Sequence, residues 1–230
     1  MLHLDRLCYQ LNEFSLTADL QIAAGDRVAV IGPSGGGKST LLNGIAGFLV
    51  PRAGQVLWNG QLMPDHPGER PLSILFQDHN LFPHLTVLDN VAIGLRPDMR
   101  LSVAQKAQAV AALDQVGLGD KAMAYPRDLS GGQQGRAGLA RVLLRQRPLL
   151  LLDEPFGGLS PTETDLMAKS IQRLHKGGRF GRLHSEGPAM IIIEHKLQQL
   201  MKIVDRVIVL NFGTMVADGL PEIVCANKEV

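Results

Sequence analysis

Apolar and polar residues alternate in short pieces through residues 1–31, for example at 2–4 and at 14–18. Alternation of this kind is typical of strands with one buried face, so we expect a small antiparallel β section near the N-terminus. Residues 55–63 extend it, because Asn59-Gly60 between two apolar pieces favours a two-residue hairpin turn. These segments predict a β section that leads into the core.

Four runs are apolar almost throughout instead of alternating, at 28–31, 72–76, 149–152 and 190–193, with Ser73 the one polar residue among them. Short continuous apolar runs indicate core strands with both faces covered. The runs therefore predict an α/β fold with a sheet at its centre.

Residues 78–148 change to helical spacing. Thr86 has the position of a helix N-cap, and residues 101–116 are rich in alanine at helical intervals. We expect a helical subdomain here, within a single domain, inserted between the two parts of the core at 1–77 and 149–230.

Composition limits the possible partners. The 230 residues, 45% of them hydrophobic, are enough for one substantial core with a subdomain. The net charge of +1, from 23 basic and 22 acidic residues, gives no electrostatic footprint for nucleic acid. Cys8 and Cys225 have no paired spacing, so we expect neither disulfides nor a zinc site, and a reducing cytosolic setting fits. No apolar run reaches the ~18–20 residues that cross a bilayer, so membrane association would come through a partner.

A glycine-rich stretch directly follows the apolar run at 28–31 and precedes a predicted helix at 41–46. It reads GPSGGGKST and consists of Gly32, Pro33, Ser34, Gly35, Gly36, Gly37, Lys38, Ser39 and Thr40. A strand, a GxxxxGKS loop and a helix in this order predict a P-loop, whose backbone N–H groups bind the β- and γ-phosphates of a nucleotide. Lys38 is expected to reach the terminal phosphates, and the Ser39 hydroxyl to ligate Mg²⁺.

Polar residues follow three of the apolar runs, at the strand ends where ligands bind in open α/β sheets. Gln77 is expected to contact Mg²⁺ and the attacking water, and Asp153 to hold Mg²⁺ through its water shell. Glu154 would orient or deprotonate that water, and His195 would contact the γ-phosphate. Each residue alone has a simpler interpretation as a polar strand end, and the P-loop in the same chain favours the catalytic one.

Ser130 and Gln133 have the spacing of a capping box at the start of a helix. The stretch also has the features of a second anion site, because a serine hydroxyl, two glycines and a helix N-terminus point at one position. Its residues are Ser130, Gly131, Gly132 and Gln133. Two sites for one phosphate would be redundant in a single chain, so the second is expected to serve another protomer.

With these motifs in order, the chain resembles the ATPase subunit of bacterial ABC transporters over nearly its whole length. The matching motifs are the Walker A at 32–40, the Q-loop at Gln77, the LSGGQ signature at 129–133, the Walker B at 149–154 and the switch histidine at His195. Tyr9 is near the family's adenine-stacking aromatic position, and a half-buried strand tyrosine is the alternative.

The resemblance implies a P-loop NTPase core of the ABC ATPase type and MgATP hydrolysis that powers solute import. It implies a homodimer with ATP at its interface, in which Ser130 and Gly132 of one protomer close on the γ-phosphate held by Lys38 of the other. It also implies permease subunits in the membrane that dock beside residues 78–85, and an indirect link to a solute-binding protein. The expected location is peripheral, on the cytoplasmic face of the inner membrane.

Two segments depart from the family pattern. Residues 157–160 read GGLS where the family usually has SALD, although Ser160, Pro161 and Glu163 still form a capping box that starts the next helix. This departure puts the aspartate's usual contact across the dimer in question. The loop at 176–188 is longer than usual, glycine-rich and basic, and we expect it to be exposed and mobile.

Residues 1–156 resemble the ATPase of the bacterial thiamine importer, whereas residues from 158 onward resemble ATPases of branched-chain amino-acid importers. The combination suggests a hybrid chain with a seam between Phe156 and Ser160, and thiamine as the transported solute. Two alternatives stay open, a nucleotide-binding module with impaired dimerisation and cycling, and a soluble ABC ATPase that acts on DNA or ribosomes. The latter usually has two cassettes or a long coiled-coil insertion, and the sequence has neither.

Overall fold

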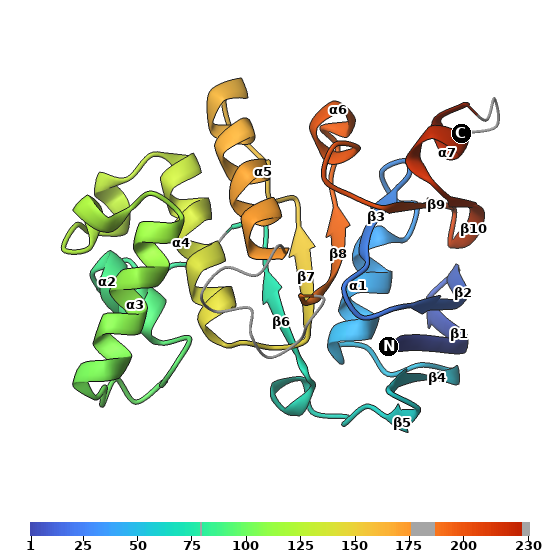
Figure 1. Cartoon of the computed structure of the whole chain (residues 1–230). Coiled ribbons are helices and arrows are strands. Elements are labelled where there is room, and N and C mark those ends of the chain that lie inside the picture. The colour runs from blue at the N-terminus through green and yellow to red at the C-terminus, as the bar shows by residue number, and fades with distance from the viewer. Residues whose placement is uncertain (79, 176–186, 227–230) are drawn as a thin grey trace.

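The computed structural model describes residues 1–78, 80–175 and 187–226. Its strands form two sheets that lie next to each other (Figure 1). The four-stranded sheet has the order β2-β1-β4-β5, and the six-stranded sheet has the order β10-β9-β3-β8-β7-β6. An α/β core with an N-terminal antiparallel β section is therefore confirmed.

The antiparallel sheet consists of β1 (Leu2–Leu11), β2 (Phe14–Ile22), β4 (Ala53–Trp58) and β5 (Gln61–Leu62). The hairpin predicted between β4 and β5 is confirmed. Asn59 and Gly60 have φ angles of 51° and 79°, and a type I′ turn requires positive φ at both positions. Leu57 then pairs with Leu62, and Trp58 with Gln61.

The six-stranded sheet consists of β3 (Arg27–Ile31), β6 (Leu72–Leu75), β7 (Leu149–Asp153), β8 (Ala189–Ile193), β9 (Arg206–Asn211) and β10 (Thr214–Gly219). All neighbours pair in parallel except β10, which forms an antiparallel hairpin with β9. The four apolar runs are thus confirmed as core strands.

Helices and the second sheet cover both faces of this sheet, which explains why the runs at 28–31, 149–152 and 190–193 in its interior strands are apolar throughout. Val28 and Val30 belong to a buried cluster that includes α1 (Lys38–Ala46) and the inner face of the antiparallel sheet. Ala29 and Ile31 point the other way, into a cluster with residues of α4, α5 and α6. The remaining helices of this part are α5 (Pro161–His175), α6 (Leu197–Leu200) and α7 (Pro221–Ala226).

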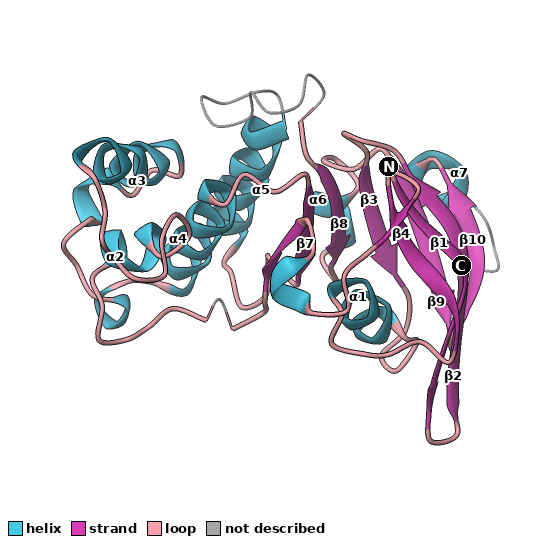
Figure 2. Ribbon diagram, turned by 90° about the horizontal axis from the view of Figure 1, so that it is seen from below, coloured by secondary structure: helices cyan, strands magenta, loops and turns pink. Residues whose placement is uncertain are grey.

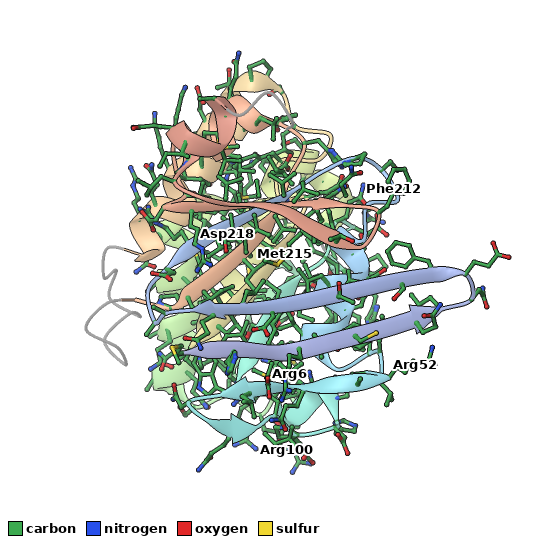
Figure 3. All side chains as sticks on the ribbon, turned by 90° about the vertical axis from the view of Figure 1, so that its right-hand side faces the viewer. Arg6, Arg52, Arg100, Phe212, Met215 and Asp218 are labelled. Atoms are coloured by element: carbon green, nitrogen blue, oxygen red, sulfur yellow. The ribbon has the colours of Figure 1, made fainter. Side chains whose placement is uncertain are left out.

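The two sheets meet where the β9–β10 hairpin lies beside the β1–β2 hairpin (Figure 3). The backbone N–H of Thr17 in β2 donates to the carbonyl oxygen of Gly213 at the β9–β10 turn, at 2.9 Å. Gly213 has a φ of 79°, and a Cβ there would collide with the Ser15 backbone. This close approach requires glycine and fixes the two hairpins against each other.

Three helices form a separate group at one end of the molecule (Figure 2). They are α2 (Val87–Ala92), α3 (Val103–Gln115) and α4 (Gly131–Leu144). Two 3₁₀ turns, Gly119–Lys121 and Pro126–Asp128, lie between α3 and α4, and a further one, Pro67–Glu69, precedes β6. The three helices share a buried cluster of their own. The predicted N-cap is confirmed, because Thr86 Oγ1 accepts the Asp89 N–H at 3.1 Å.

Of the long loop expected at 176–188, residues 176–186 lie outside the described part of the chain. Among the residues that the structure does describe, no helix has the length and apolar composition needed to span a membrane.

Candidate active site

The loop between β3 and α1 has the backbone of a phosphate cradle. Gly32 and Gly37 have φ angles of 144° and 105°, and a Cβ on Gly32 would collide with the Leu210 backbone, so only glycine fits there. Lys38 is 7% exposed, and its Nζ donates to the carbonyl oxygens of Gly32 and Pro33, both at 2.9 Å. The N-terminus of α1 has no side-chain cap, so its first N–H groups stay available to an anion.

One open pocket joins this loop to the ends of β7 and β8. It is lined by Leu11, Phe14, Ser34, Gly35, Gly37, Lys38, Ser39, Thr40, Glu154 and His195. The structure thus brings the P-loop, Glu154 and His195 together in the way that the sequence predicts. The described lining of this pocket does not include Gln77, Asp153 or the segment 130–133.

Glu154 and His195 face each other at the strand ends. His195 Nε2 lies 3.2 Å from Glu154 Oε1, and the two side chains are 54% and 26% exposed, so both reach the pocket. Glu154 has a φ of 47°, a left-handed conformation that is uncommon outside glycine, and its N–H donates to the Ile193 carbonyl oxygen at 2.9 Å. An unusual backbone at this position is typical of a functional site.

Asp153 ends β7 directly before Glu154. Burial and the Glu154 carboxylate raise the pKa of Asp153, and Lys38 opposes this effect. Mg²⁺ keeps several waters and usually takes only one or two carboxylates together with substrate phosphates. Asp153 with the Ser39 hydroxyl fits such a site, because a bound cation would relieve the repulsion between the carboxylates of Asp153 and Glu154. The described residues contain no group of three or more acidic, histidine or cysteine side chains that would form an all-protein metal cage.

Gln77 lies outside the pocket, two residues after the end of β6. It is exposed, and a Cβ built on Gly157 would lie 3.9 Å from its Cγ. The structure therefore places Gln77 beside the segment that follows the Walker B motif. Its contacts with Mg²⁺ and water remain a prediction.

Ser130 is the N-cap of α4, with the reciprocal bonds of a capping box. Its hydroxyl accepts the Gln133 N–H at 3.3 Å, and its own N–H donates to Gln133 Oε1 at 2.9 Å. The Ser130 hydroxyl also donates to Glu163 Oε1 at 2.6 Å. The second predicted capping box is present too, with Ser160 N–H to Glu163 Oε2 at 3.1 Å. Glu163 thus links the N-termini of α4 and α5, and the sequence analysis identified only its capping role.

The prediction that Tyr9 stacks on adenine is wrong, because the side chain is 1% exposed. A β-bulge lies between Leu4 and Leu7, where Arg6 has a φ of 45°, and the two-residue alternation restarts after it. Tyr9 therefore points into the core, against Gly44 of α1. Figure 3 labels Arg6 on the side of the molecule that faces the viewer, and its own side chain is 82% exposed.

Leu11 and Phe14 line the pocket in place of Tyr9, and the sequence analysis missed both. They flank the β1–β2 turn. A Cβ on Gly37 would come within 3.0 Å of the Phe14 ring, so this ring packs against the P-loop. No local pattern indicates that contact, because it depends on how the two sheets meet.

Comparison with known families and proteins agrees with this arrangement. The sequence profile of the ABC transporter family matches residues 16–157. A thiamine import ATP-binding protein ThiQ from Cereibacter sphaeroides is 47% identical over 223 residues, which is 96% of this chain and 90% of that protein. A protein of the same name from Jannaschia is 44% identical over 231 residues, covering 100% of this chain and 97% of its own length.

Two solved structures share the fold. The cbiO1 protein from Clostridium perfringens, part of the ABC transporter complex cbiONQ, aligns with a TM-score of 0.83 and 27% identity over 99% of this chain and 91% of its own. A dimeric ATP-binding cassette in a post-hydrolysis state with ADP and Pi aligns with a TM-score of 0.78 and 27% identity. That match covers 96% of this chain and 99% of the other.

Proposed function

The chain belongs to the ABC transporter family, and we propose that it supplies the ATP hydrolysis that drives thiamine import through separate membrane permease subunits. It is an ATPase of this family. The observation that carries the transport proposal is the similarity to thiamine import ATP-binding proteins, 40–47% identical over at least 94% of this chain. Permease partners, an associated solute-binding protein and a position on the cytoplasmic face of the membrane are parts of the same proposal.

The proposed mechanism is positioning with electrostatic stabilisation of the transferred phosphoryl group. Lys38, the P-loop N–H groups and His195 would neutralise charge on the γ-phosphate. Glu154 would orient or deprotonate the attacking water, and Gln77 would help to place it. The 3.2 Å contact between Glu154 and His195 supports this assignment, because it puts a base and a phosphate ligand at one point of the pocket. Bound Mg²⁺, held through Ser39 and Asp153, would add charge neutralisation of the phosphates.

The active unit in this proposal is a homodimer. Ser130 and Gly132 of one protomer would bind the γ-phosphate in the P-loop of the other. Support comes from the position of the LSGGQ segment, which begins α4 and is absent from the described lining of the P-loop pocket. Residues 78–148 would act as the helical subdomain, with 1–77 and 149–230 as the nucleotide-binding core.

The hybrid hypothesis gains no support from the comparisons. The Jannaschia protein matches 100% of this chain, including the segment between Phe156 and Ser160. The non-cycling alternative differs from the transport proposal in one property, the ability of the chain to dimerise on ATP.

Light scattering on the Glu154→Gln variant tests the proposal. Removing the base should leave ATP binding intact and nearly abolish turnover, so MgATP should convert the monomer to a stable dimer. The Lys38→Ala variant is the control, because it should neither bind ATP nor dimerise. A Glu154→Gln protein that binds ATP and stays monomeric would favour the non-cycling module, and one that hydrolyses ATP at the wild-type rate would refute the role of Glu154.

Thiamine is tested separately, by reconstitution of the chain with permease subunits in vesicles. ATP-dependent uptake should occur for thiamine and not for a branched-chain amino acid. Uptake of the amino acid alone would refute the proposed solute.

A further inference from the structure

Glu194 follows β8 directly, and its carboxylate is enclosed by backbone donors. The residue is 3% exposed. One oxygen, Oε1, accepts the Phe156 N–H at 2.6 Å, and the other, Oε2, accepts the N–H groups of His195 at 2.6 Å and Lys196 at 2.9 Å. Both oxygens of this buried side chain therefore accept backbone hydrogen bonds, three in all, and its polar atoms are not left unpaired.

These bonds join the two strand ends that carry the reacting pair. Phe156 lies two residues after Glu154, and His195 is itself bonded through its N–H. A further bond, from the Glu154 backbone N–H to the Ile193 carbonyl oxygen at 2.9 Å, joins the same two strand ends directly. The separation of the Glu154 and His195 side chains therefore depends on backbone positions that one carboxylate holds.

The Lys196 side chain also connects the segment after β8 to the segment after β7. Its Nζ donates to the Leu159 carbonyl oxygen at 2.6 Å and to Thr164 Oγ1 at 3.3 Å. Glu194 and Lys196 are thus hydrogen-bonded to the segment 156–164, which contains the unusual GGLS sequence. A shift of either segment would move Glu154 and His195 relative to each other.

We propose that Glu194 is a positioning residue, which holds Glu154 and His195 at the spacing that ATP hydrolysis requires. The inference rests on the proposed function of that pair. A carboxylate is needed because all three partners are donors. A glutamine of the same shape would set its own NH₂ group against at least one backbone N–H, and the misplacement of catalytic groups by about 1 Å can cost on the order of 100-fold in rate.

The test is steady-state ATP hydrolysis by the Glu194→Gln protein. Glu194→Asp and Lys196→Met are measured beside it. Glu222→Gln, an exposed substitution in α7, is the control. For Glu194→Gln we expect kcat to fall by roughly 10- to 100-fold with KM for ATP within about threefold. Glu194→Asp keeps the charge on a shorter arm and should recover part of kcat. Lys196→Met should lower kcat by a smaller factor, and Glu222→Gln should leave it unchanged.

A merely structural role predicts a different result. Glu194→Gln would then melt at a lower temperature but show wild-type kcat per folded molecule well below that temperature, and this outcome would overturn the inference. If Glu194→Gln does not fold, wild-type kcat in both Glu194→Asp and Lys196→Met would overturn it instead. Failure of the proposed function is distinguishable, because Glu154→Gln would then keep full activity or the wild type would show none.

Discussion

The Ser130 hydroxyl donates to Glu163 Oε1 at 2.6 Å, so the first turn of the signature helix α4 already holds a carboxylate. Gly132 also lies against the Glu163 carboxylate, since a Cβ on Gly132 would be 2.7 Å from the Glu163 carboxyl carbon. Ser130 and Gly132 are the residues that the proposed dimer needs for the γ-phosphate of the opposite protomer. In the proposed dimer Glu163 would therefore compete with that phosphate for the same hydrogen-bond donors.

The Glu163→Gln substitution should make ATP-driven dimerisation easier. Glutamine keeps the capping bond to Ser160 but removes the negative charge that repels the incoming phosphate. In the Glu154→Gln background we expect the MgATP concentration at half-dimerisation, measured by light scattering, to fall several-fold. Asp165→Asn, an exposed acid on the same helix, is the matched control and should have no comparable effect. Unchanged or weaker dimerisation of the Glu163→Gln protein would contradict the competition.

The same contact predicts a dependence of stability on pH. Bonds from Ser130 and Ser160 lower the pKa of Glu163 from its ordinary 4.5 to about 2. As the pH falls from 4.5 to about 2, Glu163 takes up its proton in the unfolded state before it does so in the folded state. The stabilisation of the fold by ionised Glu163 is therefore complete above about pH 4.5 and is lost toward about pH 2. Acid unfolding of the wild type and of Glu163→Gln should show a stability difference that shrinks over this range. A difference that stays constant down to about pH 2 would show that ionisation of Glu163 does not stabilise the fold.

The arrangement of the core could be predicted wherever a strand is covered on both faces. The run 149–152 is leucine throughout because β7 lies between β6 and β8 with a buried cluster on each side. The order of the strands could not be predicted, because it depends on crossover connections and not on any local pattern. The hairpin at Asn59-Gly60 was predictable because its turn is fixed by two adjacent residues.

The site was predictable to the same extent. Glu154 and His195 each follow a recognisable core strand, so their meeting at one sheet edge follows from the topology. The prediction for Tyr9 was wrong because a bulge at Arg6 changes which residues of β1 face inward, from Leu2 and Leu4 before it to Leu7 and Tyr9 after it. Glu163 and Glu194 look like an ordinary cap and an ordinary strand end, and their roles arise only from contacts with segments distant in sequence.

Replacing Asp153 by asparagine should stabilise the protein without nucleotide and impair the response to MgATP. The pKa of Asp153 is raised, so the folded state binds its proton more tightly than the unfolded state, and stability falls as the pH rises above the ordinary 3.8. At neutral pH we expect Tm to rise by about 2–4 °C, the shift that ~1 kcal/mol gives in a chain of this size. The gain should disappear as the pH approaches 3.8.

Thermal unfolding with and without MgATP checks this prediction, again with Asp165→Asn as the control. The increase in Tm on adding MgATP should be smaller for Asp153→Asn than for the wild type, because the proposed ligand of Mg²⁺ is lost. An Asp153→Asn protein that is no more stable than the wild type at neutral pH would show that burial and repulsion at this carboxylate do not cost stability.

Variants of Tyr9 separate its role in the core from a role in base binding. Burial raises the pKa of the Tyr9 hydroxyl to about 12, and among the described residues that hydroxyl has no hydrogen-bond partner. Tyr9→Phe should therefore raise the free energy of unfolding by about 1 kcal/mol, since leaving a buried polar group unpaired costs ~1–3 kcal/mol. Tyr9→Leu should lower stability through lost packing and leave ATP affinity unchanged.

Titration with ATP at a temperature where each variant is folded decides between the two roles. Loss of a stacking aromatic would weaken binding by ~1–3 kcal/mol, whereas a core residue has no direct contact with the base. Phe14→Ala, in the pocket lining, is the comparison and should weaken ATP binding. A tenfold loss of ATP affinity in Tyr9→Leu, with Phe14→Ala unaffected, would mean that the β1 ring reaches the nucleotide after all, and that the bulge at Arg6 is not what sets its direction.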